Sequence, residues 1–452
     1  MVRISVLQHA PEQHLPTRPG DPTPQSRNLN PLMHPFARAR ERKRALNAAK
    51  MDRIFAKPFV AALEGHIDAV ETMTKRSDSL VNIASGSWGG DIILHNLTTR
   101  QITQRVPQAH KGKVSGLCYA SADRLLSCGV DRTVKLWSAG DDGSEGSLTQ
   151  PLNVFPGKAA FNAIDHHRSD GLFATASNIV QVWDETKTSP ISNLTFPTST
   201  ETITALKFNL AESSILASCG SDRTFTLYDI RTSKAERRVV MQFRATALSW
   251  SPTLPTLLLL ASEDHNLYTF DVRHLDRPTQ IYKAHVSAVT SCEWSPTGME
   301  FVSGGWDRTV RIWQFKDGKG VQRPEVYHTN RMQRVTSTLF SGDARFVLSG
   351  SDDGNVRVWK ANASEKLGVI TARERAAIEY RNKLKERWAV DSEVSRISRS
   401  RHMPKTIRST DKLKHTMLEA KRVKEERRRK HTRAGEAKPK PEKKKIVVAE
   451  QT

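Results

Sequence analysis

The stretch GGWDRTVRIW, residues 304–313, is nearly written twice more in this chain, as CGVDRTVKLW at 128–137 and CGSDRTFTLY at 219–228. In each copy an Asp-Arg-Thr turn precedes alternating residues and ends on an aromatic side chain. Asp at such a position hydrogen-bonds the backbone that follows it, and period-two alternation is typical of a strand. The repeat therefore predicts short strands joined by the same tight turn at several places along the chain.

The position of the closing aromatic recurs every 42 to 46 residues, at His95, Trp137, Trp183, Tyr228, Phe270, Trp313 and Trp359. A period of 40–45 residues with four strands per unit is typical of propeller blades. By period and by its Gly-His or Ala-His pairs, the chain resembles the WD-repeat family. The resemblance implies an all-β fold, a seven-bladed WD-repeat β-propeller over residues 57–360. We expect residues 57–63, KPFVAAL, to close the ring, because an unpaired sheet edge would otherwise remain.

The family resemblance also implies a hydrogen-bond network in the best-preserved blades, made by a His, a Ser, the turn Asp and the closing Trp. Its members are His110, Ser127, Asp131 and Trp137 in blade two, His285, Ser303, Asp307 and Trp313 in blade six, and His328, Ser349, Asp353 and Trp359 in blade seven. A Ser-His-Asp set also occurs in hydrolases, but here it repeats inside a turn signature without a G-x-S-x-G motif. We expect a structural role and no catalytic residue. Where the pattern is lost, at Gly89 and Leu260, packing alone is expected to hold the blade.

Other motifs of catalysis or ligand binding are missing from the sequence. It contains no phosphate-binding Gly-rich loop with Lys and Ser, and no cluster of metal ligands. The four cysteines lie far apart without a CxxC pair, which argues against a disulfide framework or a zinc site. No apolar run approaches the ~18 residues of a membrane span. We therefore expect no enzyme activity, no cofactor, no small-molecule substrate and no membrane partner.

The net charge of +22 lies almost entirely outside the propeller region. Residues 361–452 hold 27 Lys and Arg against 13 Asp and Glu, while residues 61–360 hold 32 against 31. Such asymmetry indicates a polyanionic partner, most often nucleic acid. We expect residues 1–30 to be disordered and residues 31–56 to form a basic arm with a helix over 37–55. Residues 361–433 are expected to be a basic helical arm, and residues 434–452 a disordered basic tail.

The arm over 361–433 carries two kinds of candidate interaction residue. Tyr380, Leu384 and Trp388 recur every four residues after a capping box, which predicts a helix with a narrow apolar stripe for docking on protein. Helices this polar are expected to become ordered only on a partner. The RNA-binding candidates are Arg401, Lys405, Lys412, Lys414, Lys421, Arg422, Arg427, Arg428, Arg429 and Lys430. Without an aromatic RNP-like strand or a Cys/His finger, contact with phosphates is favoured over base readout.

The flanks of the propeller narrow the resemblance further. The segments on either side of the propeller are similar to the Sof family of nucleolar WD-repeat proteins. The segment before it is RALNAAKMDRIFAKPFVAALEGH, and those after it are ERAAIEYRNKLKERW and SRHMPKTIRSTDKLKHTMLEAKRVKEERRRKH. The resemblance, over about residues 31–433, implies a scaffold of the small-subunit processome with the U3 small nucleolar ribonucleoprotein. It implies a role in precursor ribosomal RNA processing and a location in the nucleus and nucleolus.

A second function remains open, as a substrate receptor of a cullin-4 RING ubiquitin ligase. Such receptors present a W/Y-D-x-R sequence at the end of a blade strand. Two neighbouring repeats carry related sequences, YDIR at 228–231 and FDVR at 270–273. The candidate residues for binding the cullin-4 adaptor are Tyr228, Asp229, Arg231, Asp271 and Arg273. The second sequence departs from the pattern because Phe replaces Trp or Tyr.

Overall fold

The structure, a computed structural model, describes residues 33–451 apart from 122, 140–149, 195–201, 316–323, 434, 435, 437, 439 and 440. The chain divides into two compact units. One joins Asn362–Arg401 to the described part of Met1–Pro58, and the other joins Phe59–Ala361 to His402–Thr452. The disorder expected for residues 1–30 lies outside the described residues. Of the helices in the described ranges, none has the length and apolar character that crossing a membrane requires.

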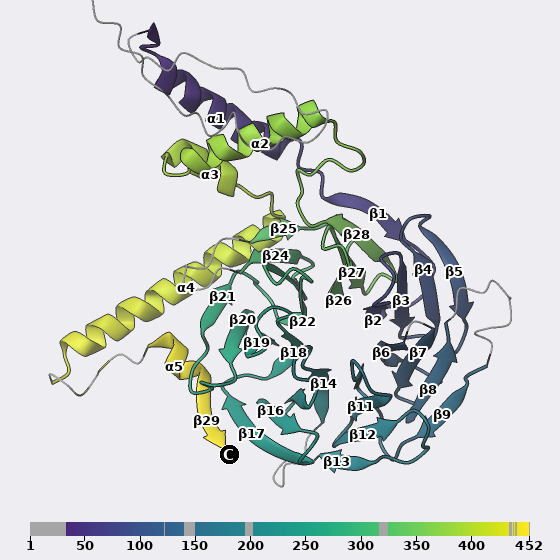
Figure 1. Cartoon of the computed structure of the whole chain (residues 1–452). Helices are drawn as coiled ribbons and strands as arrows, with labels where there is room; N and C mark the ends of the chain where they lie inside the picture. Colours follow the sequence, from purple (N-terminus) through teal and green to yellow (C-terminus); the bar gives the residue numbers. More distant parts are fainter. Residues whose placement is uncertain are drawn as a thin grey trace, which may run out of the picture. The chain divides into compact units, whose positions relative to one another are not determined.

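In the described part of the chain, the strands of the larger unit form seven antiparallel sheets arranged in a ring (Figure 1). Blades one to three contain β2 (Val70–Lys75), β3 (Asn82–Ser87), β4 (Ile92–Asn96), β5 (Gln101–Val106), β6 (Val114–Ser121), β7 (Arg124–Gly129), β8 (Thr133–Ser138), β9 (Asn153–Pro156), β10 (Ala163–His166), β11 (Leu172–Ala176), β12 (Val180–Asp184) and β13 (Ser192–Leu194). Blades four to seven contain β14 (Ile203–Phe208), β15 (Ile215–Gly220), β16 (Thr224–Asp229), β17 (Lys234–Met241), β18 (Ala245–Trp250), β19 (Leu257–Ser262), β20 (Asn266–Asp271), β21 (Gln280–Lys283), β22 (Val289–Trp294), β23 (Glu300–Gly305), β24 (Val310–Gln314), β25 (Glu325–Tyr327), β26 (Val335–Phe340), β27 (Phe346–Ser351) and β28 (Val356–Lys360). The seven-bladed propeller expected from the repeat is confirmed.

The ring closes within residues 57–63, as the sequence predicted. The strand β1 (Phe59–Leu63) pairs antiparallel with β28, with Leu63 opposite Val356 and Phe59 opposite Trp359. Leu63 is buried, and the Phe59 ring meets Trp359 edge to face at 5.7 Å between centroids. Blade seven thus takes its outer strand from the start of the propeller, which leaves no unpaired edge at the junction.

The closing aromatics build the contacts between blades, since each lies on the third strand of its sheet. Trp183 of β12 packs with Phe155 of β9 and with Phe161, so that blades two and three share one buried cluster. Trp313 of β24 lies in a cluster with Leu259 of β19. Side chains on the third strand of one blade therefore fill the space between that blade and its neighbour.

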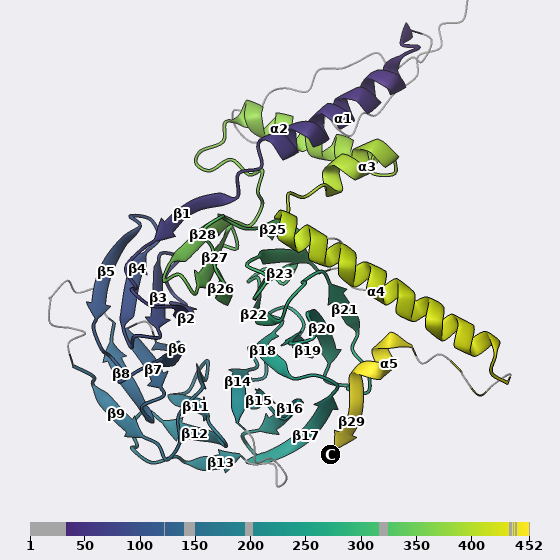
Figure 2. The same ribbon diagram turned by 180° about the vertical axis from the view of Figure 1, so that it is seen from behind.

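The larger unit also includes the end of the chain. Helix α4 (Lys405–Lys430) is followed by the short helix α5 (Glu442–Ile446) and by the strand β29 (Val447–Gln451), which pairs with β17 (Figure 2). The sequence analysis expected a disordered tail over 434–452, and the structure differs for residues 442–451. Although the sequence of this segment is of low complexity, Ile446 is buried in the core beside blade four and Val447 packs against the same cluster.

The smaller unit consists of three helices, α1 (Ala37–Ile54), α2 (Ala372–Arg387) and α3 (Ser392–Arg399), of which the last two lie in the arm that the sequence predicted to be helical. The capping box predicted at Thr371 and Glu374 is present at the start of α2. Ala45 and Ala49 of α1 pack against Leu384 of α2 and Val394 of α3. For α2 the expectation that such a helix needs a partner to become ordered is therefore corrected, because α1 and α3 supply the apolar surface that it packs against.

Candidate functional site

The Asp of each repeat turn organises the backbone around it. Asp131, Asp222 and Asp307 accept a hydrogen bond from the backbone N–H two residues later, at 3.1, 3.2 and 3.1 Å. The residue between, an Arg in these three blades, has a φ of 61° to 64°, in the left-handed region that most side chains avoid. Blade seven uses Gly354 there, where positive φ carries no steric cost. The carboxylate therefore holds a turn that the backbone alone disfavours.

Blade two brings its four predicted residues together. His110 lies between Asp131, 3.0 Å from Nδ1, and Ser127, whose Oγ is 2.7 Å from Nε2. Trp137 donates from Nε1 to the same Ser127 oxygen at 2.8 Å. Ser127 is completely buried, so its hydroxyl has no route to a substrate. These hydrogen bonds connect the turn, the loop before the first strand and the third strand of one blade.

Blade six repeats this geometry and adds a cation. The distances are 3.0 Å from His285 to Asp307, 2.8 Å from His285 to Ser303 and 2.8 Å from Trp313 to Ser303. Arg311, itself buried, donates to Asp307 at 3.1 Å. Burial alone would raise the pKa of Asp307, but the adjacent imidazole and guanidinium hold it well below its usual range. Sequence reasoning missed Arg311, although the Arg four residues after the Asp was visible.

Blade seven departs from the predicted set. Trp359 donates to Ser349 at 2.8 Å, and Asp353 accepts from Arg357 instead of from His328. His328 lies beside His402, 5.5 Å between ring centroids. His285 stands four residues before the first buried Val of its blade, but His328 stands seven before Val335. The three extra residues carry His328 away from the turn.

The degenerate blades are not held by packing alone. In blade one, His66 bonds Ser85 at 2.7 Å, while His95 fills the position of the closing aromatic and is buried. Burial lowers the pKa of both imidazoles to about 4. In blade five, the Tyr268 hydroxyl donates to Asp264 in the turn. The expectation for Gly89 and Leu260 is corrected, because other side chains in these blades supply the polar contacts.

The basic helix α4 carries most of the RNA-binding candidates. Lys412, Lys421, Arg422, Arg427, Arg428, Arg429 and Lys430 are exposed on it, as is Lys405 at its start. Arg401 precedes the helix, is half-buried and donates to the Ser398 carbonyl. Lys414 is different, because it is half-buried and donates to the His285 carbonyl at 3.1 Å. Burial lowers the pKa of Lys414.

The helix contacts the propeller through its first half. Ile407 is buried and Lys414 meets the loop before β22, whereas Leu413, Met417 and Leu418 are 61, 65 and 56 % exposed. The seven residues Arg427 to Arg433 include five basic side chains. The structure thus presents a helix whose C-terminal half is solvated and cationic. The basic side chains at the C-terminal end of α4 are suited to binding phosphates, and the exposed apolar side chains in its middle are suited to packing against a protein.

The three protein-docking candidates lie in the smaller unit. Leu384 is buried and Trp388 packs against the same cluster of α1 and α3 residues. Tyr380 is 44 % exposed, and its hydroxyl accepts from Arg44 of α1 at 3.4 Å. Leu384 and Trp388 therefore hold this unit together and are not free to dock on another protein.

The two Asp-x-Arg sequences form equivalent turns in blades four and five. Tyr228 is buried in β16, and Asp229 accepts the backbone N–H of Arg231 at 2.9 Å. Asp271 accepts the N–H of Arg273 at 3.0 Å. Both arginine side chains are exposed. The turns thus present two cations on neighbouring blades, at the strand ends opposite the Asp-Arg-Thr turns.

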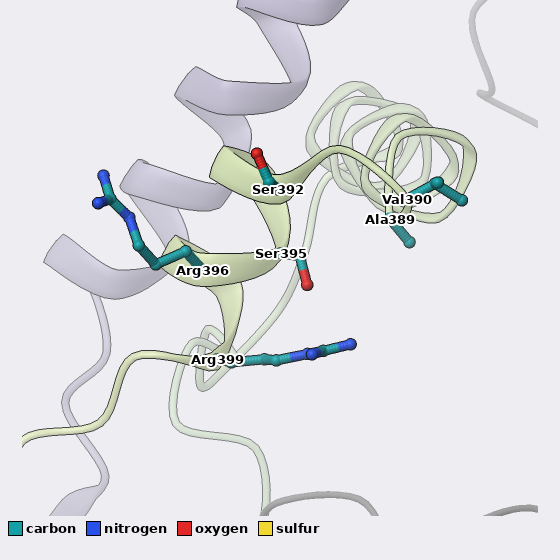
Figure 3. A pocket seen from close by; sticks show the side chains of 6 residues that line it. All are labelled: Ala389, Val390, Ser392, Ser395, Arg396 and Arg399. Atoms are coloured by element: carbon teal, nitrogen blue, oxygen red, sulfur yellow. The ribbon is translucent and has the colours of Figure 1, made fainter.

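An open concavity of about 640 Å³ lies on α3 in the smaller unit, lined by Ala389, Val390, Ser392, Ser395, Arg396 and Arg399. Figure 3 shows the two arginines extending in opposite directions from the helix. No group of three or more His, Cys, Asp or Glu suited to a metal ion occurs in the ranges the structure describes. The four cysteines are buried, and burial raises the pKa of each thiol.

Comparison with known proteins adds the family. A model described as a Sof1-like domain matches residues 361–447, and one described as a WD domain, G-beta repeat, matches 101–138, 276–314 and 325–360. The chain is 44 % identical over 449 residues to DDB1- and CUL4-associated factor 13 of Gallus gallus and 41 % identical over 449 residues to that of Homo sapiens, each covering 99 % of both chains. It is 39 % identical over 440 residues to Protein SOF1 of Saccharomyces cerevisiae, covering 92 % of this chain and 89 % of that one. The WD40 β-propeller domain of Doa1 matches in fold, with a TM-score of 0.55 at 20 % identity over 67 % of this chain and 96 % of that one.

Proposed function

Because the chain belongs to the Sof1 family of WD-repeat proteins, we propose that it is a non-catalytic assembly factor of the small-subunit processome. It works in the nucleolus on precursor ribosomal RNA, beside the U3 small nucleolar ribonucleoprotein and other processome proteins, and small ribosomal subunit biogenesis depends on it. WD-repeat propellers are typically scaffolds. The buried state of the Ser-His-Asp sets fits a structural role.

The observation that carries this proposal is the seat of α4. The helix carries exposed arginines and lysines, and Lys414 in its first half donates to the His285 carbonyl of the propeller, so the cationic end lies beyond that contact. Phosphate groups bind such side chains through charge and release counterions on doing so. The propeller then serves as the base that other proteins contact while α4 lies along RNA.

The test compares two shortened chains in cells that lack the full-length protein. A chain ending at Arg401 keeps the smaller unit and the seven propeller sheets but lacks α4, α5 and β29, and we expect uncleaved precursor ribosomal RNA to accumulate. A matched chain ending at Arg433 keeps α4 and should support cleavage. Normal processing with the chain ending at Arg401 would contradict the role of α4. Sequencing of RNA crosslinked to the full chain identifies the segments that it contacts.

A second function is favoured by a separate observation, the exposed Arg231 and Arg273 on neighbouring blades. Several relatives are named DDB1- and CUL4-associated factor 13, and we propose that this chain also serves as a substrate receptor through these turns. Arg231→Ala with Arg273→Ala should abolish co-purification of the cullin-4 adaptor and leave ribosomal RNA processing intact. Arg277→Ala, an exposed arginine in the same loop as Arg273, is the control. If the adaptor does not co-purify with the unaltered chain, the receptor role is excluded.

A further inference from the structure

The outer strand of blade four differs from those of the other blades. β17 has 8 residues, whereas β1, β5, β9, β13, β21 and β25 have between 3 and 6. In the described sheets it is also the one outer strand with a further strand, β29, on its outside. A free edge of this length presents a row of backbone donors and acceptors that pairs with any extended peptide. Blade four is thus built to accept a fifth strand.

The tail is held on this edge by a short set of contacts. Val240 lies opposite Ala449 and Met241 opposite Val447, and the Gln242 N–H donates to the Ile446 carbonyl at 2.9 Å. The Ile446 side chain is buried in the cluster that blades four and five share. At the two ends, Lys283 pairs with Glu442, and Arg237 lies 3.8 Å from Glu450. Recognition therefore uses a main apolar anchor, Ile446, with Val447 packed beside it, between two carboxylates.

The contacts on the strand itself are sparse. Of the five residues of β29, four are exposed and Val447 is intermediate, and Val448 is 67 % exposed. Little apolar surface is removed from water, while ordering an extended segment opposes binding. Attachment to α4 offsets that cost, because a short tether raises the local concentration of the tail to the millimolar range. A segment held this way exchanges with an outside competitor that makes the same contacts.

We propose that the outer edge of β17 is a strand-binding site of this protein, occupied in the free chain by its own residues 442–451. Its external ligand is a segment of another protein that forms a helical turn followed by a strand, with an acidic residue at the start of the turn, an apolar residue four positions later at its end and a second acidic residue four positions after that in the strand. Glu442, Ile446 and Glu450 define this spacing in the resident segment. RNA does not satisfy the edge, because alternating N–H and C=O groups pair with a peptide backbone. Binding of the ligand displaces the tail, so that the chain after α4 is no longer held on blade four.

The test measures the affinity of a labelled peptide of residues 440–452 for full-length chains by fluorescence anisotropy. Ile446→Asp in the chain removes the anchor and opens the edge, so this variant should bind the peptide at least tenfold more tightly than the unaltered chain. Val448→Asp introduces the same charge at an exposed position and should bind as weakly as the unaltered chain. A peptide carrying Ile446→Asp should not bind. A chain ending at Pro441 repeats the opened state without any substitution.

Two results would overturn the proposal. Equal binding by the unaltered and the Ile446→Asp chains would show that the tail does not occupy the edge. No binding by either opened chain, while backbone hydrogen exchange shows that the propeller remains folded, would show that the edge is not a separate site. Peptide display against the Ile446→Asp chain tests the ligand class directly, since selected sequences should share the acidic–apolar–acidic spacing. Selection of unrelated sequences would refute that pattern.

Discussion

Asp307 is a carboxylate with only 2 % of its side chain exposed, and its neighbours compensate its charge. His285 and Arg311 approach it at 3.0 and 3.1 Å, and Thr309 donates through both its backbone and its hydroxyl. A buried charge is tolerated only when such partners surround it. The repeated Asp is thus a structural residue whose local bonds shape a turn and whose longer bonds join strands.

Asp307→Ala should lower the free energy of unfolding by about 3 kcal/mol, because it leaves the buried guanidinium of Arg311 without its partner. Asp276→Ala, at an exposed loop position with 62 % of the side chain accessible, should change stability by less than about 0.5 kcal/mol. Both are measured by thermal and denaturant unfolding of the full chain. Equal melting of the two variants would contradict the structural role of Asp307.

The histidines of blade one make stability depend on pH. The pKa values of His66 and His95 are about 4 in the folded chain, below the ~6.5 of an unfolded imidazole. The unfolded chain therefore binds more protons than the folded chain between these pH values. The contribution of these two histidines to the free energy of unfolding is complete above pH ~6.5 and is lost as the pH falls towards 4. His95→Phe, which places the aromatic of blade five in blade one, should reduce the fall in melting temperature between pH 7 and pH 4.5. An unchanged pH profile would show that His95 does not contribute.

At the scale of elements, the two units are stabilised in different ways. In the larger unit β1 and β28 pair along a full strand, while in the smaller unit α1, α2 and α3 share a few apolar side chains around Ala45, Ala49 and Leu384. Arg42 of α1 also pairs with Asp391, the residue that caps α3, and Arg387 of α2 pairs with Glu41. Exposed ion pairs of this kind contribute little individually, so the apolar cluster decides the stability of the helices.

Leu384→Ala should therefore destabilise the smaller unit by about 3 kcal/mol, the cost of deleting a buried Leu side chain. The measurement is hydrogen exchange of the α1 and α2 amides, which should quicken while the propeller amides stay protected. Val390→Ala, at a position 96 % exposed, is the control. Unchanged exchange in α1 would mean that the cluster does not hold the helices together.

The closing strand gives a prediction for the propeller. A chain of residues 57–360 contains β1, whereas one of residues 66–360 lacks it and exposes the outer edge of β28 together with the surface that Leu63 and Phe59 cover. We expect the shorter chain to melt at least about 5 °C lower and to aggregate more readily. If both chains melted at the same temperature, closure by β1 would not stabilise the ring.

At the scale of the whole molecule, charge and fold are separated along the sequence. The propeller region is nearly neutral, while residues 1–60 and 361–452, which include α4, carry the excess of Lys and Arg. A neutral scaffold avoids non-specific attachment to nucleic acid over its full surface, and basic segments outside it confine that attachment to the arms. This division supports the proposed role of a scaffold that holds RNA through its basic arms, of which α4 carries the cluster Arg427 to Lys430.

Charge reversal at Arg427, Arg428, Arg429 and Lys430 tests that role in vitro. Six contacts to single-stranded RNA give a slope of log affinity against log salt of roughly −4, and removal of four contacts should flatten the slope by about 3. Reversal of four exposed charges on the propeller, at Arg100, Lys111, Lys187 and Lys234, is the control for net charge. If both variants show the same slope as the unaltered chain, α4 does not carry the phosphate contacts.

Local rules explain how much was predictable from the sequence. The Asp turns, the strand alternation and the period between aromatics depend on residues close together in the chain, so the propeller and the closing segment were correctly expected. His328 was wrongly assigned to the network of blade seven. Three extra residues before Val335 remove its contact with Asp353 but leave the sequence motif recognisable. Arg311 and Arg357 were missed although each stands four residues after its Asp, because a basic residue on a strand more often faces water.

The sequence by itself determined the seven-bladed ring, the position of its closure and the concentration of positive charge near the C-terminus. Only the tertiary structure decided which distant segments meet. Leu384 and Trp388 pack on α1 instead of on a partner, and Ile446 and β29 return to blade four. These contacts join residues hundreds of positions apart, and their apolar groups are too few to form a periodic pattern. Such pairs become visible only when folding places complementary surfaces side by side, because burial of a lone apolar residue depends on what lies opposite it.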